Sequence, residues 1–250
     1  MKSTNFLLTY LLASLLFLGM AVAAPVQPKA KVALSSTQKA QTPKHKPNRV
    51  SAEQLSTFST QAGGSAKRLK NIGLAVDRIN GTRLAPGRTF SFNRTVGPRT
   101  GDRGFRTATV FEDRKKVPGV GGGVSQVTGT LFNAAALAGL QIDEVHPHSR
   151  PVAYLPAGRD ATVEYGAVDL KFTNNTKSPI TIRYILQGRR LSASILGKKV
   201  PGQKISLKTK VKTLAPGKVS AMLFRTYTLR GKQQRQERLY SHIYSWNPKG

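Results

Sequence analysis

The segment from residue 121 to residue 139 constrains the fold more than any other part of the chain. It opens with three consecutive glycines and continues with small and apolar residues. The apolar positions recur at helical spacing, at Val127, Leu131, Ala134 and Ala138. Gly139 follows them and is typical of a helix C-terminus. We therefore expect a glycine-rich loop that leads into a helix packed on a core.

Ser125 stands at or near the N-terminus of this predicted helix. The unpaired N–H groups of a first helical turn favour negative charge, and neighbouring glycines let a ligand approach the backbone. A nucleophile would fit there, with backbone N–H groups from Gly123 to Gln126 as an oxyanion hole. The more common arrangement is a plain helix cap, in which the Ser125 hydroxyl accepts from the N–H of Val127 or Thr128.

A second group of chemically active residues follows the helix. His146, His148, Arg150, Arg159 and Asp160 fall within fifteen positions. They could supply a general base, a carboxylate that orients it, and a clamp for a carboxylate or phosphate. A His-x-His metal site would have only Asp160 as an obvious third ligand, so we expect no metal. Hydrogen-bonded structural histidines are the other interpretation.

Charge and cysteine content narrow the function classes. The 250 residues include 40 Lys or Arg against 11 Asp or Glu, a net charge of +29, and no cysteine. The absence of cysteine excludes disulfides, thiol nucleophiles and cysteine zinc sites. The charge predicts polyanionic partners, namely nucleic acid, anionic lipid or an anionic wall polymer. No cofactor motif is present, and we expect none.

The N-terminus predicts export. Residues 6–20 are apolar and uncharged, and they end before Ala21, Val22 and Ala23, a small-x-small pattern that signal peptidase reads. We expect cleavage between Ala23 and Ala24, with an uncleaved anchor as the alternative. The apolar stretch is shorter than the roughly 20 residues that a spanning helix needs. Export to the envelope or beyond argues against nucleic acid as the physiological partner.

Composition divides the rest of the chain into three parts. Residues 24–66 are basic and contain four prolines, which predicts a flexible tether. Residues 67–197 form the expected domain. Residues 198–250 carry 13 basic residues and one acidic residue, and Lys204, Lys208, Lys210 and Lys212 would share one face of a strand. Such a row of lysines could bind an anionic polymer, or it could protect a sheet edge against pairing with another strand.

The predicted fold class is α+β. Ser65 can cap a helix in which Leu69, Ile72, Val76 and Ile79 form the apolar face, and Asn80-Gly81 would end it. Residues 96–117 are interpreted as a long, ordered loop. Runs of β-branched and aromatic residues predict strands at 88–92, 169–173, 179–186, 190–197, 205–211, 219–229 and 233–240. We expect at least two helices on a mainly antiparallel sheet, followed by a β-rich C-terminal segment.

Short motifs along the domain resemble the VanW family. They occur in the family's order over residues 67–197: Asn71-Ile-Gly-Leu-Ala, Asn80-Gly81-Thr82, Pro86-Gly87-x-Thr-Phe-Ser-Phe-Asn93, Val96-Gly-Pro-Arg-Thr100, Gly121-Gly-Gly-Val-x-Gln-Val127, His146-Pro-His-Ser149, Gly158-Arg-Asp-Ala161 and Asp169-Leu-Lys-Phe-x-Asn-Asn175. The tail, from Arg225 to Tyr244, is also similar to the end of such proteins. The resemblance is specific because it rests on several motifs in the same order and not on any single motif.

The resemblance implies a cell-envelope protein of a family associated with glycopeptide resistance. Some members are L,D-transpeptidases, which join peptidoglycan stem peptides through a cysteine acyl-enzyme. The family's cysteine lies in the Gly-Gly-Gly-x-Cys-Gln motif, where this chain has Ser125. A serine hydroxyl needs a well-placed base, whereas a cysteine at a helix N-terminus readily becomes thiolate. The preferred prediction is therefore a variant that binds stem peptides without turnover.

Two alternatives stay open. In the first, Ser125 is a working nucleophile, with His148 or His146 as base and Asp160 as its orienting group. The substrate would then be held by Gly121, Gly122, Gly123, Gln126, Arg150 and Arg159. In the second, the protein is a basic structural protein on an anionic wall polymer or membrane surface. The expected partner is peptidoglycan or another anionic wall polymer, and the oligomeric state is left open.

Overall fold

The structure is a computed structural model that describes residues 52–112 and 115–247. The predicted signal peptide and most of the predicted tether lie outside the described residues. Within the described part, no helix has both the length and the apolar character needed to cross a membrane.

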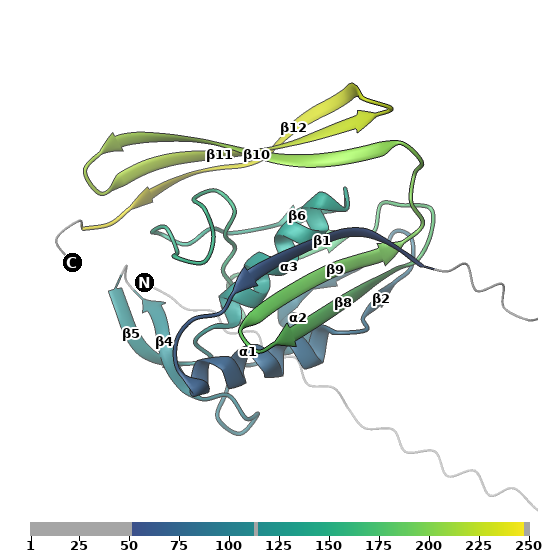
Figure 1. Ribbon diagram of the computed structural model, residues 1–250. Coiled ribbons are helices and arrows are strands. Elements are labelled where there is room, and N and C mark those ends of the chain that lie inside the picture. The colour runs from purple at the N-terminus through teal and green to yellow at the C-terminus, as the bar shows by residue number, and fades with distance from the viewer. Residues whose placement is uncertain (1–51, 113–114, 248–250) are drawn as a thin grey trace, which may run out of the picture. The chain divides into compact units, whose positions relative to one another are not determined.

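Helices and strands alternate along the chain before a long run of strands (Figure 1). In order they are β1 Glu53–Gln61, α1 Ala66–Ile79, β2 Arg83–Leu84, β3 Thr89–Ser91, α2 Phe92–Val96, β4 Thr107–Glu112, β5 Lys115–Val120, α3 Val124–Leu137, β6 Gln141–Glu144, β7 Lys171–Thr173, β8 Ile180–Gln187, β9 Arg190–Gly197, β10 Gln203–Ala215, β11 Lys218–Leu229 and β12 Lys232–Ser245. This confirms the α+β class and the β-rich C-terminal segment.

The strands form four antiparallel groups. The main sheet has the order β1-β9-β8-β2, a small sheet has the order β3-β7-β6, β4 and β5 form a hairpin, and the C-terminal sheet has the order β10-β11-β12. The predicted strand at 169–173 therefore pairs with β3 and β6, and not with β8, the strand that follows it along the chain. The reason is the turn after it, where the buried Asn174 side chain binds the carbonyls of Leu84 and Ser178 and directs the chain to another sheet.

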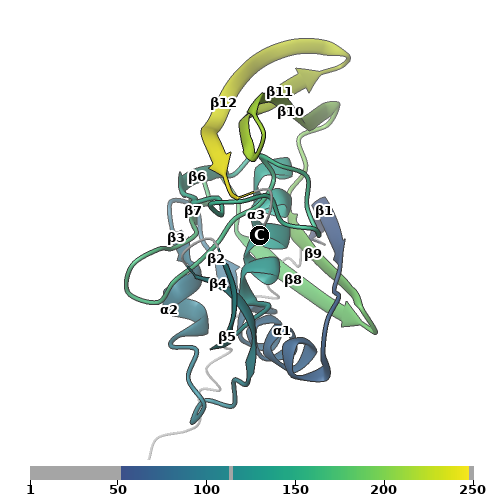
Figure 2. The same ribbon diagram turned by 90° about the vertical axis from the view of Figure 1, so that its left-hand side faces the viewer.

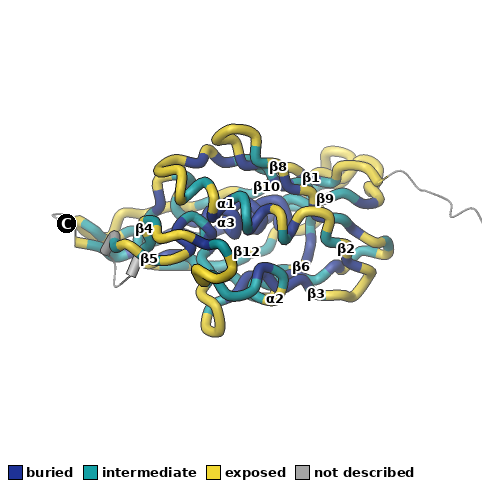
Figure 3. Tube along the Cα trace, turned by 90° about the horizontal axis from the view of Figure 1, so that it is seen from below, coloured by how far each residue is buried: buried dark blue, intermediate teal, exposed yellow. Residues whose placement is uncertain are grey.

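The core lies between α1, α3 and one face of the main sheet. Side chains alternate between buried and more exposed along β8 and β9, so only one face of these strands is buried. The helices α1 and α3 cover that face, and Figure 3 shows the buried residues gathering around them. This confirms the prediction of at least two helices packed on a mainly antiparallel sheet.

The helix α1 begins and ends as predicted. The Ser65 hydroxyl accepts from the N–H of Arg68 at 3.3 Å, and Asn80 is the C-terminal cap. Ile72, Val76 and Ile79 are buried. Local signals were sufficient here because the cap and the apolar face both lie within one short segment.

The helix α3 is more deeply buried than its apolar stripe suggested. Its polar residues Gln126, Thr128, Thr130 and Asn133 are buried together with the apolar ones. Thr128 and Thr130 donate to carbonyls one turn back, at 3.2 and 2.7 Å, and this satisfies their hydroxyls inside the core. A helix that is buried on all sides is rigid, and rigidity suits the element that carries Ser125.

The predicted tether extended too far toward the domain. Residues 53–61 form β1, which pairs with β9 in the main sheet. Its inward side chains include Ser56 and Thr60, which bond to the Ala134 carbonyl at 2.7 Å and to the Thr130 hydroxyl at 2.9 Å. A strand that is buried through hydroxyl groups has no apolar alternation for sequence analysis to detect.

The long loop predicted at 96–117 is also partly wrong. Its second half is strand β4, which forms a hairpin with β5. The strand predicted at 88–92 ends earlier, because the Ser91 hydroxyl accepts from the N–H of Arg94 at 3.1 Å and caps the short helix α2. Phe92 is therefore a buried helical residue.

The C-terminal sheet is attached to the end of α3 (Figures 1 and 2). The buried Arg225 of β11 donates to the carbonyls of Ala136 and Leu140, at 3.2 and 2.7 Å. Glu237 of β12 pairs with the same guanidinium. A cation at the carbonyl end of a helix is electrostatically favourable, so this contact fixes one face of the sheet against the domain.

Candidate functional site

Ser125 and His148 line one cavity of about 580 Å³. The glycine loop that precedes α3, the β4–β5 hairpin and residues 98–100, 152–154 and 162–165 form most of the wall. The structure thus brings together the two motifs that the sequence analysis singled out.

Ser125 does not cap α3. The N-cap is Gly123, which makes no side-chain cap bond, so the cap interpretation was wrong. The Ser125 hydroxyl instead lies 3.2 Å from the hydroxyl of Thr162. Ser125 is therefore in the first turn, in the pocket wall, and its oxygen is not used to hold the helix end.

The glycine loop has structural reasons for its composition. Gly121 and Gly123 have φ values of 87° and 106°, which other residues rarely adopt. A Cβ on Gly122 would lie 2.5 Å from the carbonyl oxygen of Thr109 in β4. The glycines thus allow the β4–β5 hairpin to pack closely against the loop. This structural role is separate from any role in ligand binding.

Some of the backbone amides predicted as oxyanion donors are already engaged. The N–H of Val124 donates to Gly121 and the N–H of Gln126 donates to Gly123, at 3.1 and 3.0 Å. The amides of Gly123 and Ser125 stay as candidate donors to a ligand in the pocket.

His148 and Asp160 form a buried pair. The Nδ1 atom of His148 lies 2.8 Å from Oδ2 of Asp160, and the backbone N–H of His148 donates to the same oxygen at 2.8 Å. Asp160 is fully buried. A neutral imidazole that donates through Nδ1 has its lone pair on Nε2, the nitrogen that would act on a substrate.

A tyrosine from the C-terminal sheet completes this pair. The buried Tyr244 hydroxyl donates to Oδ1 of Asp160 and accepts from the N–H of Gly158 at 2.8 Å. Burial, together with the nearby Asp160 charge, raises the pKa of Tyr244, so its proton stays on oxygen. In addition, His242 Nε2 donates to the His148 carbonyl at 3.1 Å. Nothing in the sequence near His148 indicated these residues of β12.

Three of the predicted site residues lie outside the residues that line the cavity, namely His146, Arg150 and Arg159. His146 is half exposed and faces Glu144 at 3.1 Å. The Nε of Arg159 donates to Asn133 in α3, and its guanidinium stacks over Phe58 of β1. Arg159 therefore joins helix to sheet in the structure, and substrate contacts of these residues stay predictions.

Gln126 is a buried bridge. Its amide nitrogen donates to the Thr60 hydroxyl and the Gln61 carbonyl, at 2.9 and 3.0 Å, and its oxygen accepts from Arg68 at 2.9 Å. The side chain thus joins α3 to β1 and positions Arg68. A direct substrate contact of this amide stays a prediction.

Two arginines that the sequence analysis missed line the cavity. Arg68 comes from α1, and Arg99 comes from the loop after α2. Burial lowers the pKa of both, although a guanidinium keeps its charge at neutral pH. Arg68 donates to Gln126 and to the Gly63 carbonyl, and Arg99 donates to Asn93 at 2.7 Å.

Neither arginine has a carboxylate within ion-pair distance among the described residues. Glu164 is the one acidic residue among those that line the cavity. The position of Arg99 in the Val-Gly-Pro-Arg motif was the available sequence signal. The cavity therefore carries positive charge that an anionic ligand would balance.

Asn71 holds the walls of the cavity in place. Its buried side-chain amide donates to the carbonyls of Arg106 and Gly122, at 2.8 and 3.0 Å, and its oxygen accepts from the N–H of Arg106 at 2.7 Å. One side chain from α1 thus positions both the glycine loop and the start of the hairpin. Its place in the first family motif has a structural explanation.

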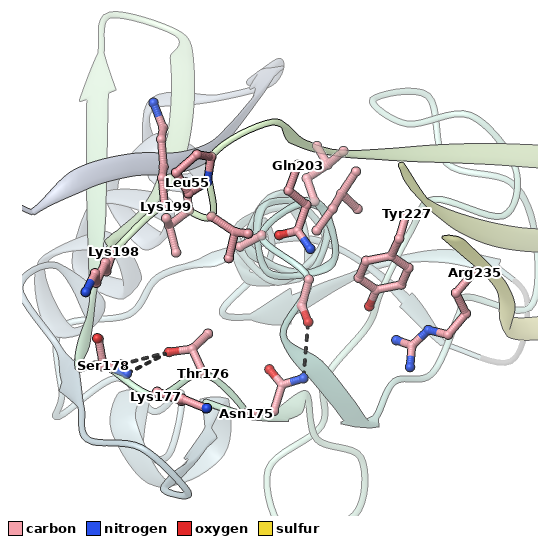
Figure 4. A pocket seen from close by; sticks show the side chains of 16 residues that line it. Leu55, Asn175, Thr176, Lys177, Ser178, Lys198, Lys199, Gln203, Tyr227 and Arg235 are labelled. Atoms are coloured by element: carbon pink, nitrogen blue, oxygen red, sulfur yellow. Dashed lines mark hydrogen bonds between the residues drawn. The ribbon is translucent and has the colours of Figure 1, made fainter. Parts of the chain in front are cut away.

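A second cavity, of about 570 Å³, lies at the other end of α3 (Figure 4). In Figure 4, Tyr227 and Gln203 from the C-terminal sheet face Asn175 across it. Lys177, Lys198, Lys199 and Arg235 surround it, where they oppose the negative carbonyl end of the helix. None of the predicted site residues lines this cavity. Among the described residues, no cluster of three or more histidines and carboxylates forms a metal site.

Comparison with known proteins adds the family context. The family model described as VanW like protein matches residues 67–196, slightly more than half of the chain. Over 173 residues the chain is 37% identical to the uncharacterized protein YoaR of Bacillus subtilis (strain 168), which covers 69% of this chain and 57% of YoaR.

A second relative is the vancomycin B-type resistance protein VanW of Enterococcus faecalis (strain ATCC 700802 / V583), 29% identical over 136 residues, or 52% of this chain and 50% of that protein. The chain thus spans between half and three fifths of the length of these two relatives. No solved structure matches this chain.

Proposed function

This chain belongs to the VanW family, and we propose that it is exported to the cell envelope and binds the stem peptides of peptidoglycan there without acyl transfer. The observation that carries the proposal is a cavity lined by Ser125, Arg68 and Arg99. The family resemblance implies a cysteine at the position of Ser125. Stem peptides are the substrate class that the family resemblance implies. Their free carboxylates are the groups that the two arginines would recognise.

Recognition of a carboxylate fits the electrostatics of the cavity. Arg68 and Arg99 are held by neutral oxygens of Gln126, Gly63 and Asn93. These bonds fix each guanidinium without neutralising it. A charge that is fixed beforehand loses little side-chain entropy when a carboxylate arrives, and hydrogen bonds between charged groups are the stronger kind.

The contacts of Ser125 favour binding over catalysis. Its hydroxyl has Thr162 as a hydrogen-bond partner at 3.2 Å. A helix N-terminus stabilises a thiolate, but it does little for a neutral hydroxyl, which needs a base to take its proton during attack. A pocket that binds stem peptides without the thiolate implied by the family resemblance is therefore the function we propose.

A serine acyltransferase is the second candidate, because His148 and Asp160 are paired and His148 lines the same cavity as Ser125. Oγ of Ser125 would attack a peptide carbonyl while Nε2 of His148 takes the hydroxyl proton. His148 would then give that proton to the departing amine as the C–N bond breaks. An acceptor amine would attack the ester, and Ser125 would recover its proton.

Intact-mass spectrometry with a disaccharide tetrapeptide separates the two candidates. We expect no covalent adduct on the wild type or on Ser125→Ala, and unchanged affinity in Ser125→Ala. Adduct on Ser125→Cys alone would show that the pocket keeps its geometry without its nucleophile. An adduct on the wild type that Ser125→Ala abolishes would establish the acyltransferase instead.

A calorimetric titration with the same ligand tests the arginines. We expect Arg99→Gln to weaken binding at least tenfold, because it removes a charge-assisted contact. Arg183→Gln is the matched control, since Arg183 of β8 is exposed and lies outside the cavity. Equal affinities of the two variants, with folding confirmed by circular dichroism, would contradict the proposed function.

A further inference from the structure

The C-terminal sheet has two faces of opposite character. On its inner face, Arg225 and Glu237 pair beside the end of α3. Glu237 is the one acidic residue of the segment 198–250, so its place on the inner face leaves the outer face without a negative charge. The two faces separate because directly paired residues of antiparallel strands point to the same side.

The strand register identifies the outer face. Lys212, Lys210 and Lys208 of β10 lie opposite Ser220, Met222 and Phe224 of β11. These lie opposite Ile243, Ser241 and Arg238 of β12. We call the cationic residues of this side the outer cationic face: Lys204, Lys208, Lys210, Lys212, Lys218 and Arg238.

All six side chains of the outer cationic face are exposed. None of them has an ion-pair partner within 4.0 Å among the described residues. Lys210 also lies 5.2 Å over the ring of Phe224. Like charges placed side by side repel one another. Binding of an anion relieves this repulsion, so it is electrostatically favourable.

Edge protection does not account for the whole face. Lysines on β10, an edge strand, would discourage pairing with another sheet. Lys218, however, belongs to β11, the central strand, and Arg238 lies on the opposite edge strand. The charge therefore extends across the sheet, and the charge of Lys218 on the central strand is not explained by protection of an edge.

We propose that the outer cationic face binds a linear phosphodiester polymer that carries no aromatic bases. Alternate residues of a strand stand about 7 Å apart, so Lys208, Lys210 and Lys212 of β10 form a row of evenly spaced charges suited to an extended polyanion. Single-stranded nucleic acid is usually held by several aromatic stacking platforms. Phe224 is the one aromatic side chain on this face, and Lys210 covers it.

The proposal is independent of the pocket function. The pocket recognises a ligand through Arg68 and Arg99, which lie in α1 and in the loop after α2. The outer cationic face lies on the side of the C-terminal sheet that is turned away from α3. A polymer on this face would hold the protein at an anionic surface while the pocket binds its own ligand.

Binding of poly(glycerol phosphate) to the full chain, measured by biolayer interferometry over a range of salt concentrations, tests the proposal. The test variant changes Lys204, Lys208, Lys210 and Lys212 to Gln. The matched control changes the exposed Lys67, Lys70, Arg83 and Arg183 to Gln and removes the same net charge. A third variant with Arg at the four test positions keeps the charge and the surface.

We expect the test variant to bind at least tenfold more weakly, and the control and the Arg variant to bind as the wild type does. Each neutralised phosphate contributes about 0.7 to the salt slope for single-stranded nucleic acid, and with a similar value here the slope should fall by about three in the test variant alone. Equal losses in the test and control variants would assign binding to net charge and overturn the proposal. Tighter binding to single-stranded DNA or to phosphatidylglycerol vesicles would overturn the choice of polymer.

Discussion

The pocket and the outer cationic face both carry positive charge, but they hold it in different ways. In the pocket, Arg68 and Arg99 are half-buried and fixed by hydrogen bonds to neighbouring side chains. On the C-terminal sheet, the lysines of β10 are exposed and have no ion-pair partners among the described residues. Fixed charges select a ligand by the geometry of their hydrogen bonds. Binding to exposed charges depends instead on ionic strength and on the total charge of the ligand.

This difference predicts which changes will unfold the protein and which will only alter binding. Groups around the pocket are linked through buried hydrogen bonds, so removing one leaves others without partners. Side chains on the outer cationic face contact solvent. Each can therefore be replaced without leaving another buried group unpaired. Stability measurements across both regions test the comparison directly.

The largest expected effect is that of Asp160→Ala. This change leaves His148 and Tyr244 without their shared buried partner, and we expect a loss of about 3–5 kcal/mol in the free energy of unfolding. Urea denaturation measures it. The control is Asp77→Ala on the exposed side of α1, for which we expect less than about 0.5 kcal/mol. Equal effects would show that Asp160 is not linked as the structure indicates.

A smaller loss is expected for Gly122→Ala. The new methyl group would lie 2.5 Å from the carbonyl oxygen of Thr109, and overpacking of this kind costs about 1–3 kcal/mol. Gly63→Ala is the control, because no atom lies within 4 Å of the added Cβ. Thermal unfolding of the two variants gives the difference. A Gly122→Ala protein as stable as the control would mean that the hairpin does not pack on the glycine loop.

Glu237 predicts a pH dependence for the inner face of the sheet. Burial alone would raise its pKa, but hydrogen bonds from Arg225 lower it below the ordinary value of 4.5. A lowered pKa means that the ionised form stabilises the fold above pH 4.5, and that this stability is lost as the pH falls through the lowered pKa. We expect Glu237→Gln to remove that part of the acid dependence.

Urea denaturation of the wild type and Glu237→Gln at pH 7, 5, 4 and 3 measures this effect. The stability difference should be largest at pH 7 and should shrink below pH 4.5. Glu53→Gln, at an exposed position of β1, is the control. A difference between the wild type and Glu237→Gln that does not vary with pH would exclude the ion pair as its source.

The smallest expected effect on stability is that of Lys208→Gln with Lys210→Gln. Both side chains are exposed and have no ion-pair partner among the described residues, so unfolding free energy should change by less than about 0.5 kcal/mol. A loss above about 1 kcal/mol would contradict the separation of the two regions. The same double variant should still lower affinity for poly(glycerol phosphate).

The sequence predicted those parts of the fold whose signals are local. The helices α1 and α3 were found from apolar spacing and their terminal residues, and the strands β8 and β9 from β-branched runs. The strand β1 was missed because its buried side chains, Ser56 and Thr60, are polar. Its partners lie in α3 and β9, far along the chain, and no local pattern reports them.

The site was predictable only in part for the same reason. The motifs around Ser125 and His148 were both selected from the sequence, and the structure places the two residues in one cavity. Arg159 was selected because it is near His148 in sequence, but it contacts α3 and β1 instead. Arg68 and Arg99 reach the cavity from earlier segments, and only the folded chain brings them together with Ser125.

Tyr244 has a consequence for the order of events during biosynthesis. Its bond to Asp160 spans 84 residues. At a synthesis rate of about 5–20 residues per second, Asp160 exists for roughly 4 to 17 seconds before its partner is made. During that interval the carboxylate cannot be buried with all its donors, so the pocket matures late. A nascent chain that stops after residue 197 would carry every motif of residues 67–197 and still lack the bond from Tyr244 to Asp160.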